Sequence, residues 1–349
     1  MSIRADSHSS HRCALVGVRS SRNHLAVMKA FQFDNVEEGL VLKDVPTPKP
    51  ESGEVVVRVE AAGLCHSDTH VLHGKGASWT NKRPITLGHE AAGTVAGIGS
   101  GVTGWKVGDR VGVAVYPTDD GDSSHIIGIG RDGGYAEQVV VPANVLVRLP
   151  DAVSFAQAAV ATDSIATAYH AVISEGEVTA STTVAIVGMG GLGLNGVRVA
   201  ALQGATVYGV DIDENKFPEG LAQGAKACFS KLSDIPEDVV IDVVVDYAGM
   251  GVTTQEAMQR VKLSGTVVLV GIGVASFEFS SLTLLLRGLT IRGSKGATLP
   301  EYLEILKLIA AGKIVPKLTE VPFSTVPESL KRLEQVGGVV GRLYTRPNA

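Results

Sequence analysis

The chain has 349 residues, more than one hydrophobic core usually organises, so two domains are expected. Its 45% hydrophobic and 19% charged residues are typical of a soluble globular enzyme, and a net charge of −5 gives no reason to expect nucleic acid or an anionic membrane as a partner. No apolar run approaches the roughly 18 to 20 residues that span a bilayer. The expected partners are therefore small molecules.

Residues 1–27 differ from the rest of the chain in composition. They hold four arginines, many serines and a single acid, Asp6. A leader of this kind resembles a mitochondrial transit peptide, and an unstructured extension is the other interpretation; in both cases the segment should lie outside the fold. The three cysteines, Cys13, Cys65 and Cys228, are too few for a disulfide framework. A reducing compartment is therefore expected, the cytoplasm or, with a transit peptide, the mitochondrion.

The two halves of the remaining chain differ in their patterns of hydrophobic residues. From Met28 to about Val147, short β-branched runs alternate with glycine-containing turns, as in an antiparallel barrel. From Thr183 onward, buried strands alternate with helical stretches, which predicts a parallel sheet of βαβ units. The tail is expected to return to the first domain. Strands are predicted at 55–59, 93–97, 136–141, 183–187, 205–210, 243–246 and 339–344, and helices at 192–203 and around 301–306.

A glycine-rich segment follows the predicted strand 183–187. It reads Gly188-Met189-Gly190-Gly191-Leu192-Gly193, and Asp211 comes 18 residues after the last glycine. This is the context of a dinucleotide-binding turn: Gly188 allows the tight turn, Gly190 lets the backbone approach the pyrophosphate, and Gly193 permits close helix–strand packing. Asp211 would bind the ribose hydroxyls and repel a 2′-phosphate, which favours NAD over NADP. The alternative is a glycine-rich loop in an unrelated α/β protein.

Three residues far apart in the chain offer ligands that suit zinc. Cys65, His89 and Asp163 supply a thiolate, an imidazole and a carboxylate. Three protein ligands leave one position of a tetrahedral site open, which is the arrangement of a catalytic zinc. Together with the glycine motif, they predict zinc-assisted hydride transfer. Asp163 has a competing interpretation, as the N-cap of a helix over 164–171.

Several motifs together resemble those of a known family. They are Gly63-Leu64-Cys65-His66-Ser67-Asp68-Thr69-His70, Gly88-His89-Glu90, Val107-Gly108-Asp109-Arg110-Val111, the glycine fingerprint, and Val210-Asp211-Ile212 with Lys216. From about Met28 to the C-terminus the chain resembles the zinc-dependent alcohol dehydrogenases of the medium-chain dehydrogenase/reductase superfamily. The resemblance implies an α/β fold, with a GroES-like antiparallel β-barrel catalytic domain over 28–164, a doubly wound Rossmann domain over 165–296, and a return to the catalytic domain over 297–349.

The resemblance also implies roles at the metal. Cys65 and His89 would bind the catalytic zinc, and Asp163 stands where many relatives place a second cysteine ligand. Glu90 would be a transient ligand, and Asp68 would orient His89 through the ring nitrogen that does not bind metal. The proton relay of the family corresponds to Ser67 and then His70, which would carry the proton of the alcohol to solvent.

At the cofactor, the resemblance implies a second set of roles. His66 would face the pyrophosphate, Thr167 would pack by the nicotinamide, and Lys216 would assist Asp211 at the ribose. Arg342 would reach the pyrophosphate from late in the chain. The full cofactor-binding set is His66, Thr167, Gly188, Gly190, Gly191, Leu192, Gly193, Asp211, Lys216, Val270, Ile272 and Arg342.

The chain departs from the family in two places. Many relatives insert a four-cysteine lobe with a structural zinc, but residues 113–132 contain no cysteine, so one catalytic zinc and no structural zinc are expected. His125 and the nearby acids Asp119, Asp120 and Asp122 are interpreted as a solvated turn. Where relatives carry a large aromatic residue, this chain has Val115, which implies a roomier substrate pocket. Trp79 and Tyr116 are candidates to refill it.

The predicted reaction is hydride transfer between a primary or secondary alcohol and NAD, with an aldehyde or ketone as substrate in reverse. Two alternatives stay open: a double-bond or imine reductase on the same fold, against which Ser67 and His70 count, and a non-catalytic NAD-binding protein. A homo-oligomer, dimer or tetramer, is expected. Residues 284–291 are a candidate edge strand for subunit pairing.

Overall fold

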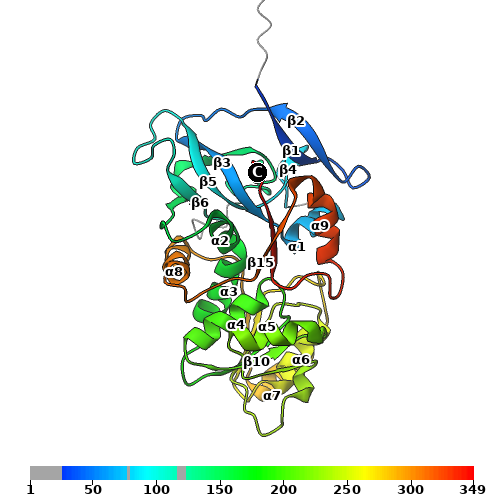
Figure 1. Ribbon diagram of the computed structural model, residues 1–349. Coiled ribbons are helices and arrows are strands. Elements are labelled where there is room, and N and C mark those ends of the chain that lie inside the picture. Colours follow the sequence, from blue (N-terminus) through cyan, green and yellow to red (C-terminus); the bar gives the residue numbers. More distant parts are fainter. Residues whose placement is uncertain (1–25, 77–78, 116–122) are drawn as a thin grey trace, which may run out of the picture.

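The computed structural model describes residues 26–76, 79–115 and 123–349. In Figure 1 a strand-rich upper lobe lies above a lower lobe built on a parallel sheet, and helices connect the two. The leader expected over 1–27 falls almost wholly outside the described residues, as do Tyr116, Asp119, Asp120 and Asp122. No helix in the described part of the chain is both long enough and apolar enough to cross a bilayer.

The upper lobe contains two sheets, and their strands are antiparallel except for β15 and β16. One sheet has the order β2-β1-β4; the other has the order β15-β16-β3-β5-β6-β8, and β7 also pairs with β3. The strands predicted at 55–59, 93–97 and 136–141 correspond to β3, β5 and β7. The bounds are β1 Val27–Phe33, β2 Leu40–Pro46, β3 Glu54–Gly63, β4 Ile85–Thr86, β5 Glu90–Ile98, β6 Arg110–Val113, β7 Gln138–Pro142, β8 Leu146–Arg148, β15 Leu318–Val321 and β16 Arg342–Thr345.

One hydrophobic core joins the two sheets of the upper lobe. Val55, Val57 and Val59 alternate along β3 and pack in the same cluster as Phe31 and Phe33 of β1. Alternation places these side chains on one face of each strand. Since burying a Val or Phe side chain contributes about 1.5–3 kcal/mol, this shared core keeps the strands that carry the site residues in a fixed register.

The lower lobe is a six-stranded parallel sheet with the order β11-β10-β9-β12-β13-β14. Alternate residues of β9 face opposite layers: Val184 and Ile186 pack in the core that contains α4, whereas Ala185 and Val187 pack in the core that contains α6. The sheet is therefore covered by helices on both faces, as expected for a doubly wound fold. The strands are β9 Thr183–Val187, β10 Thr206–Val210, β11 Ala227–Phe229, β12 Val243–Asp246, β13 Thr266–Leu269 and β14 Thr290–Gly293; the helices are α4 Gly193–Leu202, α5 Phe217–Gln223, α6 Val252–Arg260 and α7 Ser281–Arg287.

A continuous helical run connects the lobes. It consists of α2 Phe155–Val160, η2 Ala161–Ile165, α3 Ala166–His170 and η3 Ala171–Glu175. The N-cap is Ser154, whose side chain accepts a hydrogen bond from the main-chain N–H of Gln157. Within the run, η2 and η3 are wide π-type turns, which recur in proteins at functional sites. The shorter helical turns elsewhere are η1 Ala143–Val145, η4 Glu214–Lys216, η5 Leu232–Asp234 and η6 Phe323–Thr325.

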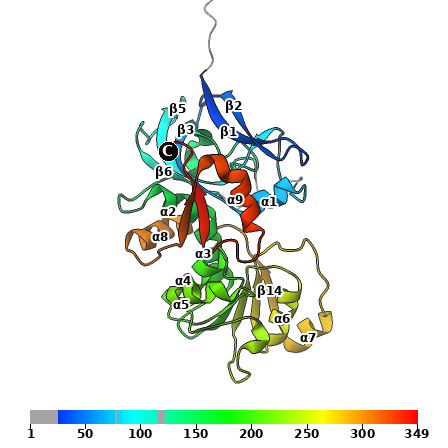
Figure 2. The same cartoon turned by 45° about the vertical axis from the view of Figure 1, so that its right-hand side comes forward.

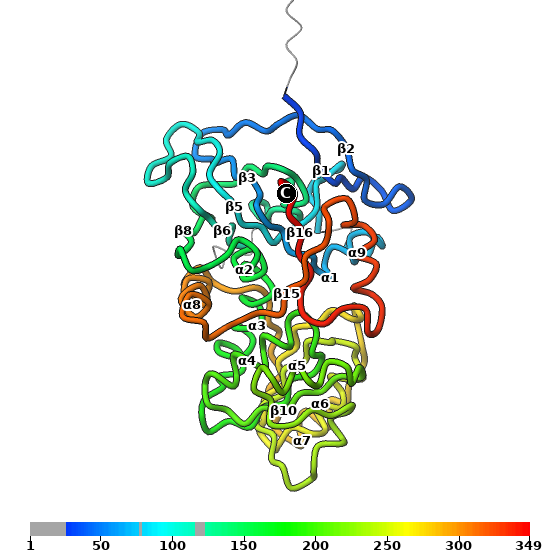
Figure 3. Tube along the Cα trace, in the orientation of Figure 1, coloured from blue at the N-terminus to red at the C-terminus, as the bar shows by residue number. Residues whose placement is uncertain are grey.

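The tail lies against the upper lobe. Helices α8 (Leu299–Ala310) and α9 (Val326–Leu333) flank β15, and α9 packs against α1 (His66–Leu72), as Figure 2 shows. The final strand β16 lies beside β3, with Tyr344 opposite Gly63; the red and blue parts of the trace meet there in Figure 3. The predicted strand at 339–344 is thus real, but it begins at Arg342.

The prediction of an edge strand at 284–291 is wrong for its first half. Residues up to Arg287 form α7, because Ser280 caps the start of the helix and Gly288, with φ of 59°, ends it in the left-handed conformation. Only Thr290–Gly293 form the edge strand β14. The leucine-rich sequence carried no signal that separated the helix from the strand.

Candidate active site

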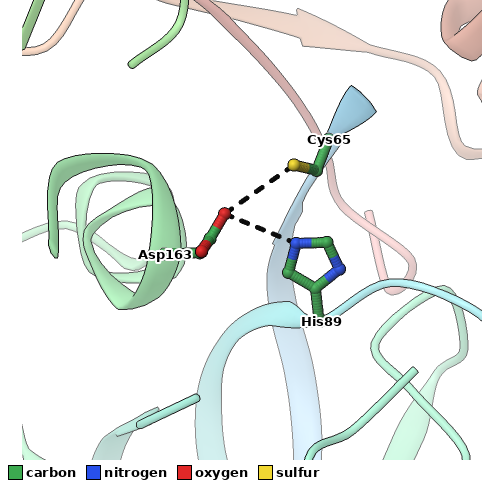
Figure 4. Close-up of side chains that lie close together, drawn as sticks. All are labelled: Cys65, His89 and Asp163. Carbon is green, nitrogen blue, oxygen red and sulfur yellow. Dashed lines mark hydrogen bonds and ion pairs between the residues drawn. The ribbon is translucent and has the colours of Figure 1, made fainter. Parts of the chain in front are cut away.

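Three side chains from separate segments converge between the lobes. Cys65 follows β3, His89 precedes β5, and Asp163 lies in η2. Asp163 Oδ2 is 3.7 Å from Cys65 Sγ and 3.4 Å from His89 Nε2, the two contacts dashed in Figure 4. All three ligand atoms lie within 4.8 Å of one another. We call Cys65, His89 and Asp163 the metal cluster.

Asp163 does not cap a helix. The helical run begins eight residues earlier, after Ser154, so Asp163 stands in its interior, and the interpretation of Asp163 as the N-cap of 164–171 is wrong. The wide turn at η2 orients the carboxylate toward the other two members of the cluster. Its second oxygen, Oδ1, accepts a hydrogen bond from the Thr167 hydroxyl at 3.0 Å. The carboxylate is thus oriented from one side and open to the cluster on the other.

The metal cluster suits a divalent cation. His89 is almost fully buried, which opposes its protonation, but Asp68 and Cys65 raise the pKa of the imidazole well above its usual value. Burial also opposes ionisation of Asp163, but hydrogen bonding to His89 lowers the pKa of this carboxyl below its ordinary value. The pocket therefore favours positive charge among anionic oxygen and sulfur groups. A thiolate, an imidazole and a carboxylate at this spacing are a donor set that fits zinc.

Asp68 lies beside the ring of His89. Its Oδ1 is 3.6 Å from His89 Nδ1, and its Oδ2 accepts a hydrogen bond from the Tyr135 hydroxyl at 2.6 Å. The ring of Tyr135 occupies the space above Gly88, where an added Cβ would lie 2.6 Å from it, and Gly88 has φ of 92°. Glycine is therefore required just before His89, both by the conformation and by the ring.

Glu90 is held by Arg342 rather than left free. Arg342 Nη2 donates to Glu90 Oε1 at 2.6 Å and Nε donates to Oε2 at 3.2 Å, and both side chains are buried. Burial raises the pKa of Glu90 to about 7, against the lowering effect of Arg342. Arg342 Nη2 is also 3.6 Å from Asp163 Oδ2. The guanidinium balances the negative charge that the metal cluster and Glu90 concentrate.

The expected relay residues both lie on α1, and Ser67 is next to the cluster. Ser67 Oγ is 3.5 Å from Cys65 Sγ, which places the hydroxyl beside a cluster ligand. His70 stands three residues further along the same helix, partly exposed, with its ring edge-on to Trp79 at 6.0 Å. Burial lowers the pKa of His70 below its ordinary value. A hydroxyl at the cluster and an imidazole that reaches solvent are the two groups that a proton relay needs.

The glycine motif forms the loop between β9 and α4, as predicted. A Cβ added at Gly193 would lie 1.9 Å from the carbonyl oxygen of Gly188, so no other residue fits there. At Gly190, by contrast, the position of a Cβ is open space, as required where a ligand approaches the backbone. The residues therefore fit a dinucleotide, because the loop packs closely against the strand at Gly193 and leaves open space at Gly190.

Asp211 directly follows β10 and contacts this loop. Its carboxylate accepts hydrogen bonds from the main-chain N–H of Met189 at 2.7 Å and from Lys216 Nζ at 3.0 and 3.1 Å. The acid and the lysine that the sequence paired thus lie together. Arg342 is close by as well, since a Cβ at Gly191 would lie 3.2 Å from its side chain.

The other predicted cofactor residues lie on or next to α1, α3 and β13. His66 is exposed, and its Nε2 is 2.7 Å from the carbonyl oxygen of Leu333. Thr167 is buried and bonded to Asp163. Val270 and Ile272 follow the end of β13, and half of Ile272 is exposed. Val115, the residue expected to widen the substrate pocket, is buried.

Three polar residues at the site were not predicted from the sequence. Tyr135 holds Asp68, and Ser164 and Asn195 both bond to the carbonyl oxygen of Gly191. Tyr135 lies in the segment Gly133-Gly134-Tyr135-Ala136, whose two glycines mark a turn but do not indicate the partner of the tyrosine. For Ser164 and Asn195 no signal existed, because their partner is a main-chain carbonyl that any sequence provides.

Comparisons with known proteins identify the family. Residues 51–151 match the alcohol dehydrogenase GroES-like domain, and residues 191–311 match the zinc-binding dehydrogenase family. An alcohol dehydrogenase of Geobacillus stearothermophilus is 32% identical over 340 residues, covering 91% of this chain and 99% of that protein. An acryloyl-coenzyme A reductase of Sulfurisphaera tokodaii is 29% identical, covering 92% of this chain and 100% of that protein.

A solved structure is similar over both lobes. Acetophenone reductase from Geotrichum candidum, in complex with NAD, has a TM-score of 0.84 and 31% identity, covering 92% of this chain and 97% of that one. The chain belongs to the zinc-type alcohol dehydrogenases of the medium-chain dehydrogenase/reductase superfamily. The predicted family and the predicted two-part α/β fold are confirmed.

Proposed function

We propose that the protein transfers hydride between a primary or secondary alcohol and NAD, with one zinc per chain held by Cys65, His89 and Asp163. Membership of the family makes the chain an NAD-dependent oxidoreductase of alcohols and carbonyl compounds. The single observation that carries the assignment of ligands is the convergence of the thiol, imidazole and carboxylate within 4.8 Å. A zinc in this cluster would supply a Lewis acid that lowers the pKa of an alcohol, and NAD would accept the hydride.

Other residues of the chain would orient the ligands, carry the proton and bind the cofactor. Asp68 would fix the tautomer and direction of the His89 ring, with Tyr135 orienting Asp68 in turn. Ser67 would accept the hydroxyl proton of the substrate, and His70 would pass it to solvent. The open face at Gly190 would admit the pyrophosphate, and Asp211 with Lys216 would bind the ribose, favouring NAD over NADP. Glu90 would be able to approach the metal only after releasing Arg342.

A direct experiment tests this proposal. The purified protein is incubated with NAD and a panel of aliphatic, allylic and aromatic alcohols, and its zinc content is measured by elemental analysis. We expect NADH formation with at least one class of alcohol and one tightly held zinc per chain. Two tightly held zincs per chain would contradict the proposal of one zinc, which follows from the absence of cysteine in residues 113–132.

A second candidate function is reduction of a double bond. The similarity to a protein named acryloyl-coenzyme A reductase favours it, since an acryloyl group contains a carbon–carbon double bond. The presence of Ser67 beside the metal cluster and of His70 on the same helix favours alcohols instead. NADH oxidation with an acryloyl thioester, compared with an aldehyde of similar size, separates the two.

We also propose a homo-oligomer that forms through the lower lobe. The edge strand β14 follows α7 in the chain, and Leu282, Leu285 and Leu286 of this helix are 62–75% exposed. An open strand edge beside exposed leucines invites pairing with a second copy. Light scattering of the wild type and of the Leu285→Glu/Leu286→Glu variant measures this, with a smaller assembly expected for the variant.

The proposed domain boundaries follow the two lobes, and the proposed compartment is the cytoplasm. We place the catalytic domain at 28–164 and 297–349 and the cofactor domain at 165–296, with the helical run 155–175 crossing between them. The sparse cysteines support the cytoplasm as the compartment. The mitochondrial alternative depends on the leader, which is outside the described residues.

A further inference from the structure

The carbonyl group of Gly191, in the middle of the glycine loop, is held from behind by two side chains. Ser164 Oγ donates a hydrogen bond to it at 2.8 Å, and Asn195 Nδ2 donates a second at 2.7 Å. The two side chains also contact each other, with Nδ2 3.3 Å from Oγ. Ser164 is fully buried and Asn195 is 8% exposed. Both donors are thus removed from solvent and committed to one carbonyl.

This arrangement fixes the direction of the next N–H group. A trans peptide is planar, so its C=O and N–H point in opposite directions, and holding the Gly191 carbonyl inward turns the Leu192 N–H outward. Leu192 caps the start of α4, where the first N–H groups have no intrahelical acceptor and are available to an anion. The side of the peptide away from Ser164 and Asn195 is where the pyrophosphate of a dinucleotide would bind.

Ser164 belongs to the helical run that carries Asp163 rather than to the glycine loop. It follows Asp163 directly in η2, and its main-chain N–H donates to Glu90 Oε1 at 3.0 Å. One residue therefore contacts the glycine loop with its side chain and the buried Glu90–Arg342 pair with its backbone. No other role in the proposed mechanism uses its hydroxyl.

We propose that Ser164 and Asn195 are positioning residues for the cofactor: they hold the Gly191 carbonyl so that the Leu192 N–H is oriented for the pyrophosphate before the cofactor arrives. The inference rests on the proposed function, because it assumes a dinucleotide in this loop. It assigns the two side chains no contact with the cofactor. Their effect is on affinity for ligands that contain the pyrophosphate.

The test compares three ligands in wild type, Ser164→Ala and Asn195→Ala. NADH binding is followed by its fluorescence, and ADP-ribose and adenosine by displacement of NADH. We expect Kd for NADH and for ADP-ribose, which share the pyrophosphate, to rise by the same factor of about ten in each variant. Adenosine, which lacks phosphate, should keep its Kd within about twofold. Ser174→Ala is the matched control, because Ser174 lies in the same helical run but donates to Glu301.

Several results would overturn the inference. Wild-type affinity for NADH in both variants would do so, as would an equal loss for adenosine, which would indicate a general structural defect. If Ser164→Ala does not fold, Asn195→Asp serves as the test, because it removes the amide donor while keeping the size of the side chain. Unchanged NADH affinity in Asn195→Asp would contradict the proposal. A wild-type protein that binds none of the three ligands overturns the proposed function together with this inference, and so is distinguished from failure of the inference alone.

Discussion

The metal cluster and the glycine loop are assembled in different ways. Cys65 and Asp163 are 98 residues apart, and Arg342 is 252 residues from the Glu90 that it pairs with. The glycine loop and Asp211, by contrast, belong to one βαβ unit between Thr183 and Asp211. In the cluster each charged group contacts the others, so the effects of substitutions there should be strongly non-additive. Substitutions at the glycine loop should affect cofactor binding without affecting the metal cluster.

The largest effect is expected for Cys65→Ala. Removing the thiolate should abolish zinc binding and lower kcat by more than about 10³-fold, because the Lewis acid contributes several kcal/mol. The fold should persist, since Cys65 is not part of a described hydrophobic core cluster. Zinc content, kcat and the far-UV spectrum measure this. Cys228→Ala is the control, because Cys228 lies half-buried beside Met189 in the other lobe. One zinc per chain retained in Cys65→Ala would contradict the assignment.

The next effect, at Asp163, tests whether the members of the cluster act as a unit. Asp163→Ala should weaken zinc binding by at least about 100-fold and lose turnover with it, while Asp163→Cys should keep zinc because a thiolate suits the same position. The double variant with Cys65→Ala should be no worse than Cys65→Ala alone. Competition with a chelator gives the zinc affinity. Full zinc occupancy and normal turnover in Asp163→Ala would eliminate the ligand and leave Glu90 as the third one.

A smaller and separable effect is expected at Asp211. Asp211→Gly should reduce the ratio of kcat/KM for NAD to that for NADP by about 10- to 100-fold, because the carboxylate that repels a 2′-phosphate is lost. Zinc content and KM for the alcohol should stay unchanged, unlike in the variants of the metal cluster. The two ratios are measured with the same alcohol. A wild type that prefers NADP would refute the role of Asp211.

The smallest effect concerns stability between the lobes. Partial burial of Glu301 opposes its ionisation, but hydrogen bonds from His170, Ser174 and Thr298 lower its pKa to about 2, below the usual 4.5. A lowered pKa stabilises the fold above about pH 4.5, and this stabilisation is lost as the pH falls toward 2. Glu301→Gln should therefore lower Tm by about 2 °C at pH 7. The difference in Tm between the wild type and this variant should shrink between pH 4.5 and 3. A difference in Tm that grows as the pH falls would contradict a lowered pKa of Glu301.

The same contrast explains what the sequence could predict. Strands β9 and β12 lie at the predicted residues, and α4 is within a residue of its expected ends, because local hydrophobic pattern and glycine chemistry define a βαβ unit. The residue types of the metal cluster suggested zinc ligands, and the resemblance to a family supported the choice, but no local pattern in the sequence brings Cys65 and Asp163 together. Their convergence depends on how the strands and the helical run pack.

Other parts of the site depended on three-dimensional contacts. Tyr135 reaches Asp68 only because Gly88 leaves room for its ring, and Arg342 meets Glu90 only because β16 pairs with β3. The helix α7 was missed since its capping residues, Ser280 and Gly288, are common residues in any surface segment. Packing between distant segments, rather than local propensity, decided these features.

The pairing of β16 with β3 also sets an order on folding of the chain. During synthesis, Glu90 leaves the ribosome long before Arg342, and in the interval the buried carboxylate has no guanidinium beside it. The upper lobe therefore cannot complete its interior until the last strand has been made, whereas the lower lobe has all six of its strands by Gly293. The cofactor lobe should mature first and the metal-binding lobe second, with the final strand closing the site.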